Sequence, residues 1–254
     1  MVVLLVASLS MLISFKFLGA EAEVLTVLAD KTVPLIERLR FIGIFSNNLD
    51  EFFKVRYATV KRIAQAGKGG RSVLGGAKAK DLLERITKIV IKQQTESLRI
   101  LNEVQLALEQ ENIFMVNEQK ASPSQSAYIE KYFIEKVSPA LVTMILDDID
   151  EMPSIKDKAA YLAIRMIMKE QVKNTKKVTR FFKPRVKKVK YALIEIPKTI
   201  DRFIVLPSEG DKQYIIILDD LIRHSLGNIF NIFEYESLSA HMIKITRDAE
   251  LDID

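Results

Sequence analysis

Apolar residues recur every three or four positions over two long stretches in the first half of the chain. The first stretch starts at Pro34, which suits the first position of a helix because its missing N–H is not needed there, and it runs to residue 66. The second covers residues 78–111. A period near 3.6 residues predicts a long amphipathic helix in each stretch, with one face in a core. Together they predict an antiparallel helical bundle that ends near Asn112.

The pattern of apolar positions changes in the second half of the chain. Short apolar or alternating runs there are bounded by Pro, Gly and charged residues, which is typical of β-strands. After a short extended segment at Ile113–Val116, these runs predict the strands Ala160–Met168, Val189–Ile196, Phe203–Leu206 and Tyr214–Leu218.

Two helices are expected among these strands. Ser122 is a candidate N-cap with Pro123 at the first helical position, and the helix that follows is stopped by Pro139. A second helix is expected over Asp219–Phe233. The fold class is therefore α+β. We expect an N-terminal antiparallel helical bundle at residues 1–117, followed by a partial mixed α+β domain at residues 118–254.

The first 28 residues allow two interpretations. An apolar run followed by Ala20-Glu21-Ala22 resembles a signal peptide, but no Lys or Arg precedes the run. A membrane span needs roughly 20 apolar residues, which is more than this run offers. The alternative is the first helix of the bundle, buried on most sides, and we prefer it because helical stretches follow. A targeting role or an association with a membrane stays open.

Three polar residues interrupt the first long helical stretch. Ser46, Asn47 and Asn48 follow one another, and their side chains compete for backbone hydrogen bonds in the middle of a helix. Either the helix breaks at this point or these polar groups contact something.

The block Ile44–Phe53 (IFSNNLDEFF), together with the preceding PLIERLRF and the following KVR, resembles the N-terminal domain of the bacterial polyphosphate kinase family. Weaker matches follow in the family's order at Tyr191–Pro197, Ile215–Asp220 and Lys244–Glu250. The resemblance implies an ATP:polyphosphate phosphotransferase that acts reversibly with Mg²⁺ on ATP and inorganic polyphosphate. It also implies a homo-oligomer assembled through the α+β (head) domain.

The resemblance assigns one binding residue to this chain. In the family the second Asn of the block contacts the adenine region of the nucleotide, and the matching residue is Asn48. Ser46 and Asn47 are interpreted as structural. The nearby charged residues could orient phosphates, but we expect them to form exposed ion pairs instead: Asp50, Glu51, Lys54 and Arg56.

The family's catalytic residues are expected outside this chain. The histidine that carries the phosphoryl group, and the groups that bind Mg²⁺ and phosphate, belong to downstream catalytic domains in the family. The contexts of His224 (RHSLG) and His241 (AHMIK) do not match that histidine, so both are interpreted as surface or interface residues. The chain ends at ITRDAELDID without a cap or turn signal, so we expect a truncated chain that is inactive alone.

Charge is concentrated in one segment. Residues 171–194 contain nine Lys or Arg and no acid, although the net charge of the whole chain is only +5. The segment is interpreted as a solvated hairpin tip, as a polyanion-binding surface, or as a surface where bases stack on Phe181 and Phe182. The residues proposed for polyanion contact are Lys183, Arg185, Lys187 and Lys188.

This segment supports the alternative function of a non-catalytic interaction module, with a basic arm that binds polyanions or nucleic acid; no specific nucleic acid is expected as a partner. The Gly-rich residues 67–76 follow a predicted helix rather than a strand, so they are interpreted as a loop and not as a phosphate-binding loop. Cysteine is absent, which excludes disulfides and thiolate metal sites and fits a reducing cytoplasm.

Overall fold

The computed structural model describes residues 18–65, 79–146, 155–169 and 188–247. It divides into two compact units, residues 1–111 with 246–254 and residues 112–245, and each is described by itself. The Gly-rich loop, the first 17 residues and most of the basic segment lie outside the described residues. The two units divide between Glu111 and Asn112, a few residues before the boundary predicted at residues 117/118.

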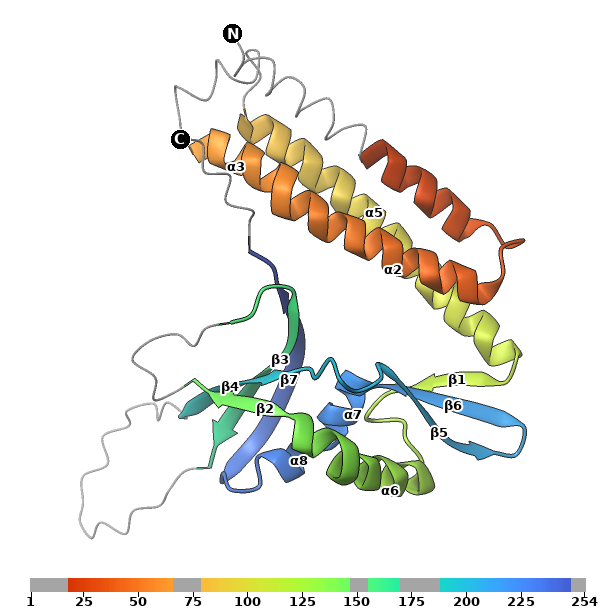
Figure 1. Ribbon diagram of the computed structural model, residues 1–254, viewed down its shortest axis with the longest axis vertical. Coiled ribbons are helices and arrows are strands. Elements are labelled where there is room, and N and C mark those ends of the chain that lie inside the picture. The colour runs from red at the N-terminus through yellow and green to blue at the C-terminus, as the bar shows by residue number, and fades with distance from the viewer. Residues whose placement is uncertain (1–17, 66–78, 147–154, 170–187, 248–254) are drawn as a thin grey trace, which may run out of the picture. The chain divides into compact units, whose positions relative to one another are not determined.

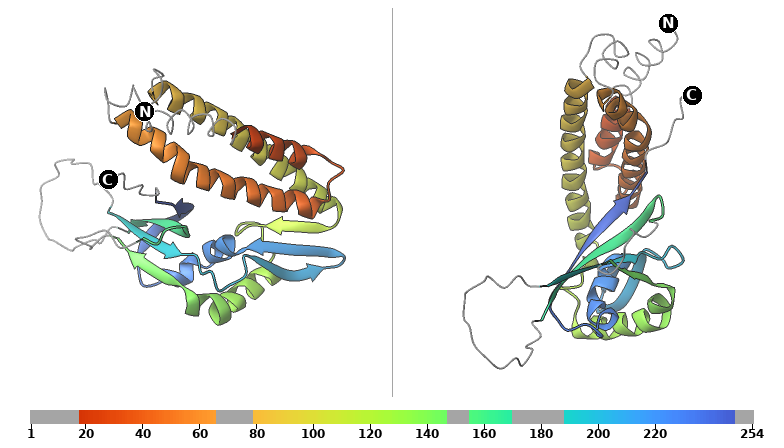
Figure 2. Two further views of the ribbon diagram at one scale, coloured as in Figure 1. Left: turned by 45° about the horizontal axis from the view of Figure 1, so that its top comes forward. Right: turned by 90° about the vertical axis from the view of Figure 1, so that its left-hand side faces the viewer.

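The first unit is entirely helical in its described part, as predicted. Residues 18–29 form a first helix, and α2 (Leu35–Glu51) begins directly after Pro34. Figure 1 shows the first helix, α2 and α5 lying alongside one another, and Figure 2 shows the same group from two further sides. The remaining elements are a π-helix at Phe52–Tyr57, α3 (Ala58–Gln65) and α5 (Ala79–Gln110).

The long helix does not break at its three polar residues. Ser46 and Asn47 are exposed within α2, and the helix continues past them. The irregularity comes four residues later, in the π-helix Phe52–Tyr57. A π-turn adds one residue to the turn, so the apolar pattern changes phase. Phe52 is buried, and beyond the π-helix Val60 is buried whereas Ile63 is only half-buried.

The buried stripe of α5 includes polar as well as apolar residues. Leu98 is apolar, yet 61% of its surface is exposed. The positions that face the core at helical spacing are Val90, Gln93, Ser97 and Ile100, so two polar residues lie in the stripe and a leucine lies beside it. The helix ends as expected near Asn112, which has a φ of 58° in the left-handed region that Asn tolerates after a helix.

The second unit contains two β-sheets and short helices (Figure 1). One sheet has the order β1-β6-β5, with β1 (Ile113–Val116) parallel to β6 (Lys212–Ile217) and β5 (Phe203–Glu209) antiparallel to β6. The other has the order β2-β4-β3-β7 and is antiparallel throughout. Its strands are β2 (Val142–Ile145), β3 (Ala159–Met168), β4 (Val189–Glu195) and β7 (Tyr235–Ile245).

One apolar core joins both sheets of the second unit to its helices. Alternate residues of the strands point into this core, which is why the short alternating runs predicted strands correctly. Helices α6 (Pro123–Tyr132) and α7 (Leu218–His224) cover it. The fully buried members include Ile129, Leu162, Met166, Ile194, Ile216, Leu221 and Ile222.

The helix expected over 219–233 is shorter and divided. α7 ends at His224, and a second short helix, α8, covers Leu226–Ile229 after Ser225. The chain then enters β7, the longest strand, which pairs with β3 along its length. Polar and apolar residues alternate imperfectly in β7, and most of its side chains are half-buried. The periodicity of the sequence alone therefore did not predict this strand.

The predicted cap of α6 is confirmed. The Ser122 hydroxyl accepts a hydrogen bond from the Gln125 backbone N–H, and the Gln125 side chain accepts one from the Ser122 N–H, which completes a capping box. The Ser122 hydroxyl also donates to Glu209 Oε1 at 2.7 Å, which ties the start of α6 to β5.

Replacement of this cap should destabilise the chain measurably. We expect Ser122→Ala to lower the free energy of unfolding by about 1 kcal/mol, because it leaves helix N–H groups without a partner. Ser124→Ala is the matched control: Ser124 is exposed and also contacts Glu209, but it does not cap the helix, so it should change stability by less than about 0.5 kcal/mol. Urea unfolding followed by circular dichroism measures both. Equal stability of the two variants would contradict the capping assignment.

Candidate functional site

Asn48 lies on α2 with its amide directed at the first helix. Its Nδ2 donates a hydrogen bond to Glu21 Oε1 at 2.9 Å. Asn48 itself is half-buried, whereas Ser46 and Asn47 are exposed. Of the two explanations for the polar triplet, a contact is therefore the correct one, and Asn48 is the residue that makes it. Its side chain is not sealed inside the bundle.

Glu21 is a carboxylate in a core position. Only 2% of its surface is exposed, and it lies in register with Leu18, Leu25 and Leu28 on the buried side of the first helix. Burial raises the pKa of Glu21 because it removes water from the charged form, and the hydrogen bond from Asn48 lowers that pKa in part. Its second oxygen, Oε2, is buried and has no hydrogen-bond partner in the described part of the chain. Asn48 is thus its sole donor there.

Two further polar side chains bind the backbone of the same helix. Arg38 of α2, which is buried, donates from Nε to the carbonyl of Leu28 at 2.6 Å. Gln93 of α5, also buried, donates from Nε2 to the carbonyl of Leu18 at 2.8 Å. Arg38 also lies 4.0 Å from a carboxylate oxygen of Glu103. The first helix is therefore held at both ends of its described part as well as at Glu21.

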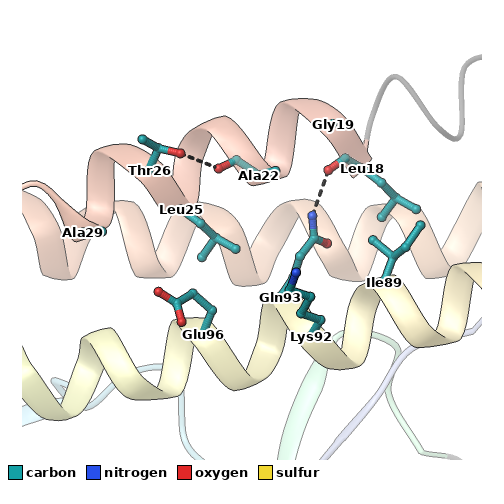
Figure 3. A pocket seen from close by; sticks show the side chains of 10 residues that line it. All are labelled: Leu18, Gly19, Ala22, Leu25, Thr26, Ala29, Ile89, Lys92, Gln93 and Glu96. Carbon is teal, nitrogen blue, oxygen red and sulfur yellow. Dashed lines mark hydrogen bonds between the residues drawn. The ribbon is translucent and has the colours of Figure 1, made fainter.

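A groove of about 630 Å³ runs between the first helix and α5 (Figure 3). Small and apolar side chains form most of it, and the amide of Gln93 crosses it toward Leu18 (Figure 3). Glu21 and Asn48 do not line it, so the groove and the Asn48 contact are separate features of the unit. The lining residues are Leu18, Gly19, Ala22, Leu25, Thr26, Ala29, Ile89, Lys92, Gln93 and Glu96.

The aromatic residues beyond Asn48 belong to the π-helix. Phe52 is fully buried, while Phe53 is 36% exposed and its ring lies 4.9 Å from the ring of Tyr57. Asp50 follows Asn48 by two residues, and side chains at that spacing do not face each other on a helix. The expectation that the charged residues here form exposed ion pairs stays a prediction; Asp50 and Lys54 are half-buried and Glu51 is exposed.

The other residues singled out from the sequence fall elsewhere. Lys183, Arg185 and Lys187 lie outside the described residues, and Lys188 is exposed just before β4. His224 lies at the end of α7 with Nε2 3.1 Å from the Ser126 hydroxyl, and its Nδ1 is buried.

His241 is exposed on β7, opposite Ala163 of β3. The described ranges contain no group of three or more Asp, Glu or His side chains placed to hold a metal ion. Within the same ranges, no helix has both the length and the apolar character needed to cross a membrane.

The sequence analysis missed Glu21 as a site residue. The signal was present: the spacing of residues 18, 21, 25 and 28 places an acid on the apolar face of a helix. An acid there needs a partner because burying a charge is costly. The polar triplet at Ser46–Asn48 in the next helical stretch is a second anomaly, so a contact between the two could have been proposed from the sequence.

Two family models match the chain. The one described as "Polyphosphate kinase N-terminal domain" covers residues 15–116, and the one described as "Polyphosphate kinase middle domain" covers residues 124–254. The helical unit and the α+β unit are thus the first and second domains of one class of kinase. The chain belongs to the polyphosphate kinase family.

Similar proteins agree with this assignment. The chain is 39% identical to a polyphosphate kinase of Vibrio cholerae and 35% identical to one of Escherichia coli, over 93% of this chain and 32% of each relative. The crystal structure of polyphosphate kinase from Porphyromonas gingivalis matches with a TM-score of 0.73 at 28% identity, covering 94% of this chain and 33% of that one. The chain therefore spans about a third of the length of these relatives.

The buried carboxylate predicts a pH-dependent stability. As the pH rises from 4.5, the ordinary value for Glu, Glu21 ionises in the unfolded chain before it ionises in the folded chain. The folded state then binds more protons than the unfolded state, so Glu21 lowers the stability of the fold as the pH rises through its raised pKa.

Glu21→Gln removes the ionisable group and with it this pH-dependent loss of stability. We expect its stability relative to the unsubstituted chain to increase as the pH rises from 4.5 toward 8, because the neutral amide has no charge to bury. Glu23→Gln, on the exposed side of the same helix, is the matched control, and its effect on stability should stay within about 0.5 kcal/mol. Urea unfolding at several pH values measures both. A flat profile for Glu21→Gln would mean that the carboxylate is hydrated in the folded chain.

Proposed function

We propose that this chain forms part of the nucleotide-binding surface of a polyphosphate kinase, which transfers the terminal phosphate of ATP to inorganic polyphosphate. The observation that carries the proposal is the position of Asn48. It lies in the first of the two family domains, it is half-buried rather than enclosed, and its amide is oriented by one partner only. An amide offers both a donor and an acceptor, which suits the edge of a purine.

The other parts of the proposal concern the whole protein. ATP and inorganic polyphosphate are its proposed substrates, and Mg²⁺ is the ion that accompanies the nucleotide; no residue of this chain is assigned to hold it. The α+β unit is proposed to provide the contacts of a homo-oligomer, and the cytoplasm is the proposed location. For the alternative of a polyanion-binding module, Lys188 is the one assigned residue within the described ranges, and its exposure alone favours neither function.

Substitution of Asn48 tests the proposal. We expect Asn48→Ala to weaken ATP binding to the chain by about fivefold to tenfold, the equivalent of ~1 kcal/mol for one hydrogen bond. Asn47→Ala removes the same kind of side chain from an exposed position one residue earlier, and should leave the dissociation constant within about twofold. A ligand-observed NMR titration with ATP measures both.

A loss of binding could also come from the Glu21 charge that Asn48→Ala leaves without a donor. The double variant Glu21→Gln/Asn48→Ala removes that charge, and it should bind ATP as weakly as Asn48→Ala does. Unchanged ATP binding in Asn48→Ala, or an equal loss in Asn47→Ala, would reject Asn48 as the nucleotide contact.

The isolated chain is expected to make no polyphosphate. Phosphoryl transfer depends on positioning the reacting groups and neutralising their charge, and we assign those groups to the two thirds of the relatives' length that this chain does not span. Formation of acid-insoluble phosphate from radiolabelled ATP, with a full-length polyphosphate kinase as the positive control, measures this. Polyphosphate synthesis by the purified 254-residue protein would overturn the assignment.

A further inference from the structure

We infer that Glu21 is a positioning residue: it fixes which end of the Asn48 amide faces the nucleotide, and so favours a base edge that donates a hydrogen bond. The inference rests on the proposed function and deepens it, because it names the chemical feature of the base that is selected. That feature is the 6-amino group of a 6-aminopurine.

The contact between Glu21 and Asn48 allows only one orientation of the Asn48 amide. An ionised carboxylate only accepts hydrogen bonds, so it can face the Nδ2 end of an amide but not the Oδ1 end. Nδ2 accordingly lies 2.9 Å from Glu21 Oε1. A rotation of the amide by half a turn would bring Oδ1 against the carboxylate oxygen. With Glu21 only 2% exposed, little water is present to screen that repulsion.

Glu21 cannot move away from Asn48 without cost. Its helix is held by the bonds from Arg38 to the Leu28 carbonyl and from Gln93 to the Leu18 carbonyl. The other carboxylate oxygen of Glu21 has no partner in the described part of the chain. Loss of the Asn48 bond would therefore leave a buried charge without any donor there, which is costly.

The Oδ1 end of the Asn48 amide is left to contact a ligand. No hydrogen bond is made to Oδ1 of Asn48 within the described ranges, and this atom is not among the buried polar atoms that lack a partner. It therefore keeps some contact with solvent and, in the described part of the chain, an unused capacity to accept a hydrogen bond. An acceptor fixed in this orientation binds the 6-amino group of adenine and gains nothing from a purine that lacks it.

The experiment compares two nucleotides at pH 8 on the 254-residue chain. ATP is one, and purine riboside 5′-triphosphate, in which hydrogen replaces the 6-amino group, is the other. The unsubstituted chain should prefer ATP by about fivefold to tenfold, as expected for one hydrogen bond. In Glu21→Gln the preference should fall below about twofold, because the Gln amide both donates and accepts, so the Asn48 amide can turn and donate to the ring nitrogen N1.

Glu21→Gln separates positioning from packing. The substitution keeps the shape of the side chain and an acceptor for Nδ2, so a merely structural contact would survive it and the preference for ATP would stay unchanged. An unchanged preference therefore overturns the inference while leaving the proposed function intact. If the unsubstituted chain binds neither nucleotide, the proposed function falls, and this inference with it.

A second measurement tests the orientation of the amide without any nucleotide. The side-chain amide signals of Asn48, assigned by their loss in Asn48→Ala, should shift in both Glu21→Gln and Glu21→Ala. Glu23→Gln should leave them in place. Signals that are the same in Glu21→Ala and in the unsubstituted chain would mean that no hydrogen bond holds the amide, and this too would overturn the inference.

Discussion

The helical unit depends on how its first helix is held. Burial of Leu18, Leu25 and Leu28 supplies most of the driving force, but apolar contact is non-directional and does not by itself fix how far one helix has slid or turned against another. Hydrogen bonds from Asn48, Arg38 and Gln93 do so, because each needs its acceptor at a particular place. These acceptors lie at residues 18, 21 and 28, spread along the described part of the helix.

Of these three contacts, the one at Glu21 differs in kind. The Leu28 carbonyl lies in the last turn of the helix, where carbonyls lack an intrahelical donor, so Arg38 satisfies a group that is present in any sequence. Gln93 likewise bonds a backbone carbonyl, that of Leu18. Glu21, in contrast, contributes a side-chain acceptor that other sequences need not have. An apolar residue at this position would pack without the cost of a buried charge. Local rules of stability are most often violated at functional sites, which agrees with the proposal that Asn48 contacts a ligand.

Much of the fold follows from the sequence because local signals were consistent there. The ends of α5 and the cap of α6 depend on residues next to one another, such as Asn112 after the helix and the Ser122–Gln125 pair. The strands are evident as short apolar runs, as in β3 and β4, and burial alternates from residue to residue at the start of β5. In these places the signal lies in a few neighbouring residues.

The missed features depend on contacts between segments that are distant in the sequence. The π-helix at Phe52–Tyr57 changes the phase of the apolar pattern, and a count with a fixed period of 3.6 residues cannot anticipate it. Leu98 is exposed because Gln93 and Ser97 take core positions, which is favourable for Gln93 only once Leu18 lies opposite. Glu21 is separated from its partner by 27 residues, so neither residue alone predicts the site.

If the proposed function holds, the free energy of one hydrogen bond from Asn48 indicates what the helical unit contributes to nucleotide binding. One hydrogen bond changes a dissociation constant by about tenfold, whereas the affinity for a nucleoside triphosphate comes mainly from groups that neutralise its phosphates. A fixed amide acceptor thus adds little to the total affinity and much to the choice of base. For base selection, the orientation of the Asn48 amide therefore matters more than positive charge on the helix that carries it. The buried carboxylate of Glu21 supplies orientation at a cost in stability that a purely structural contact would have no reason to bear.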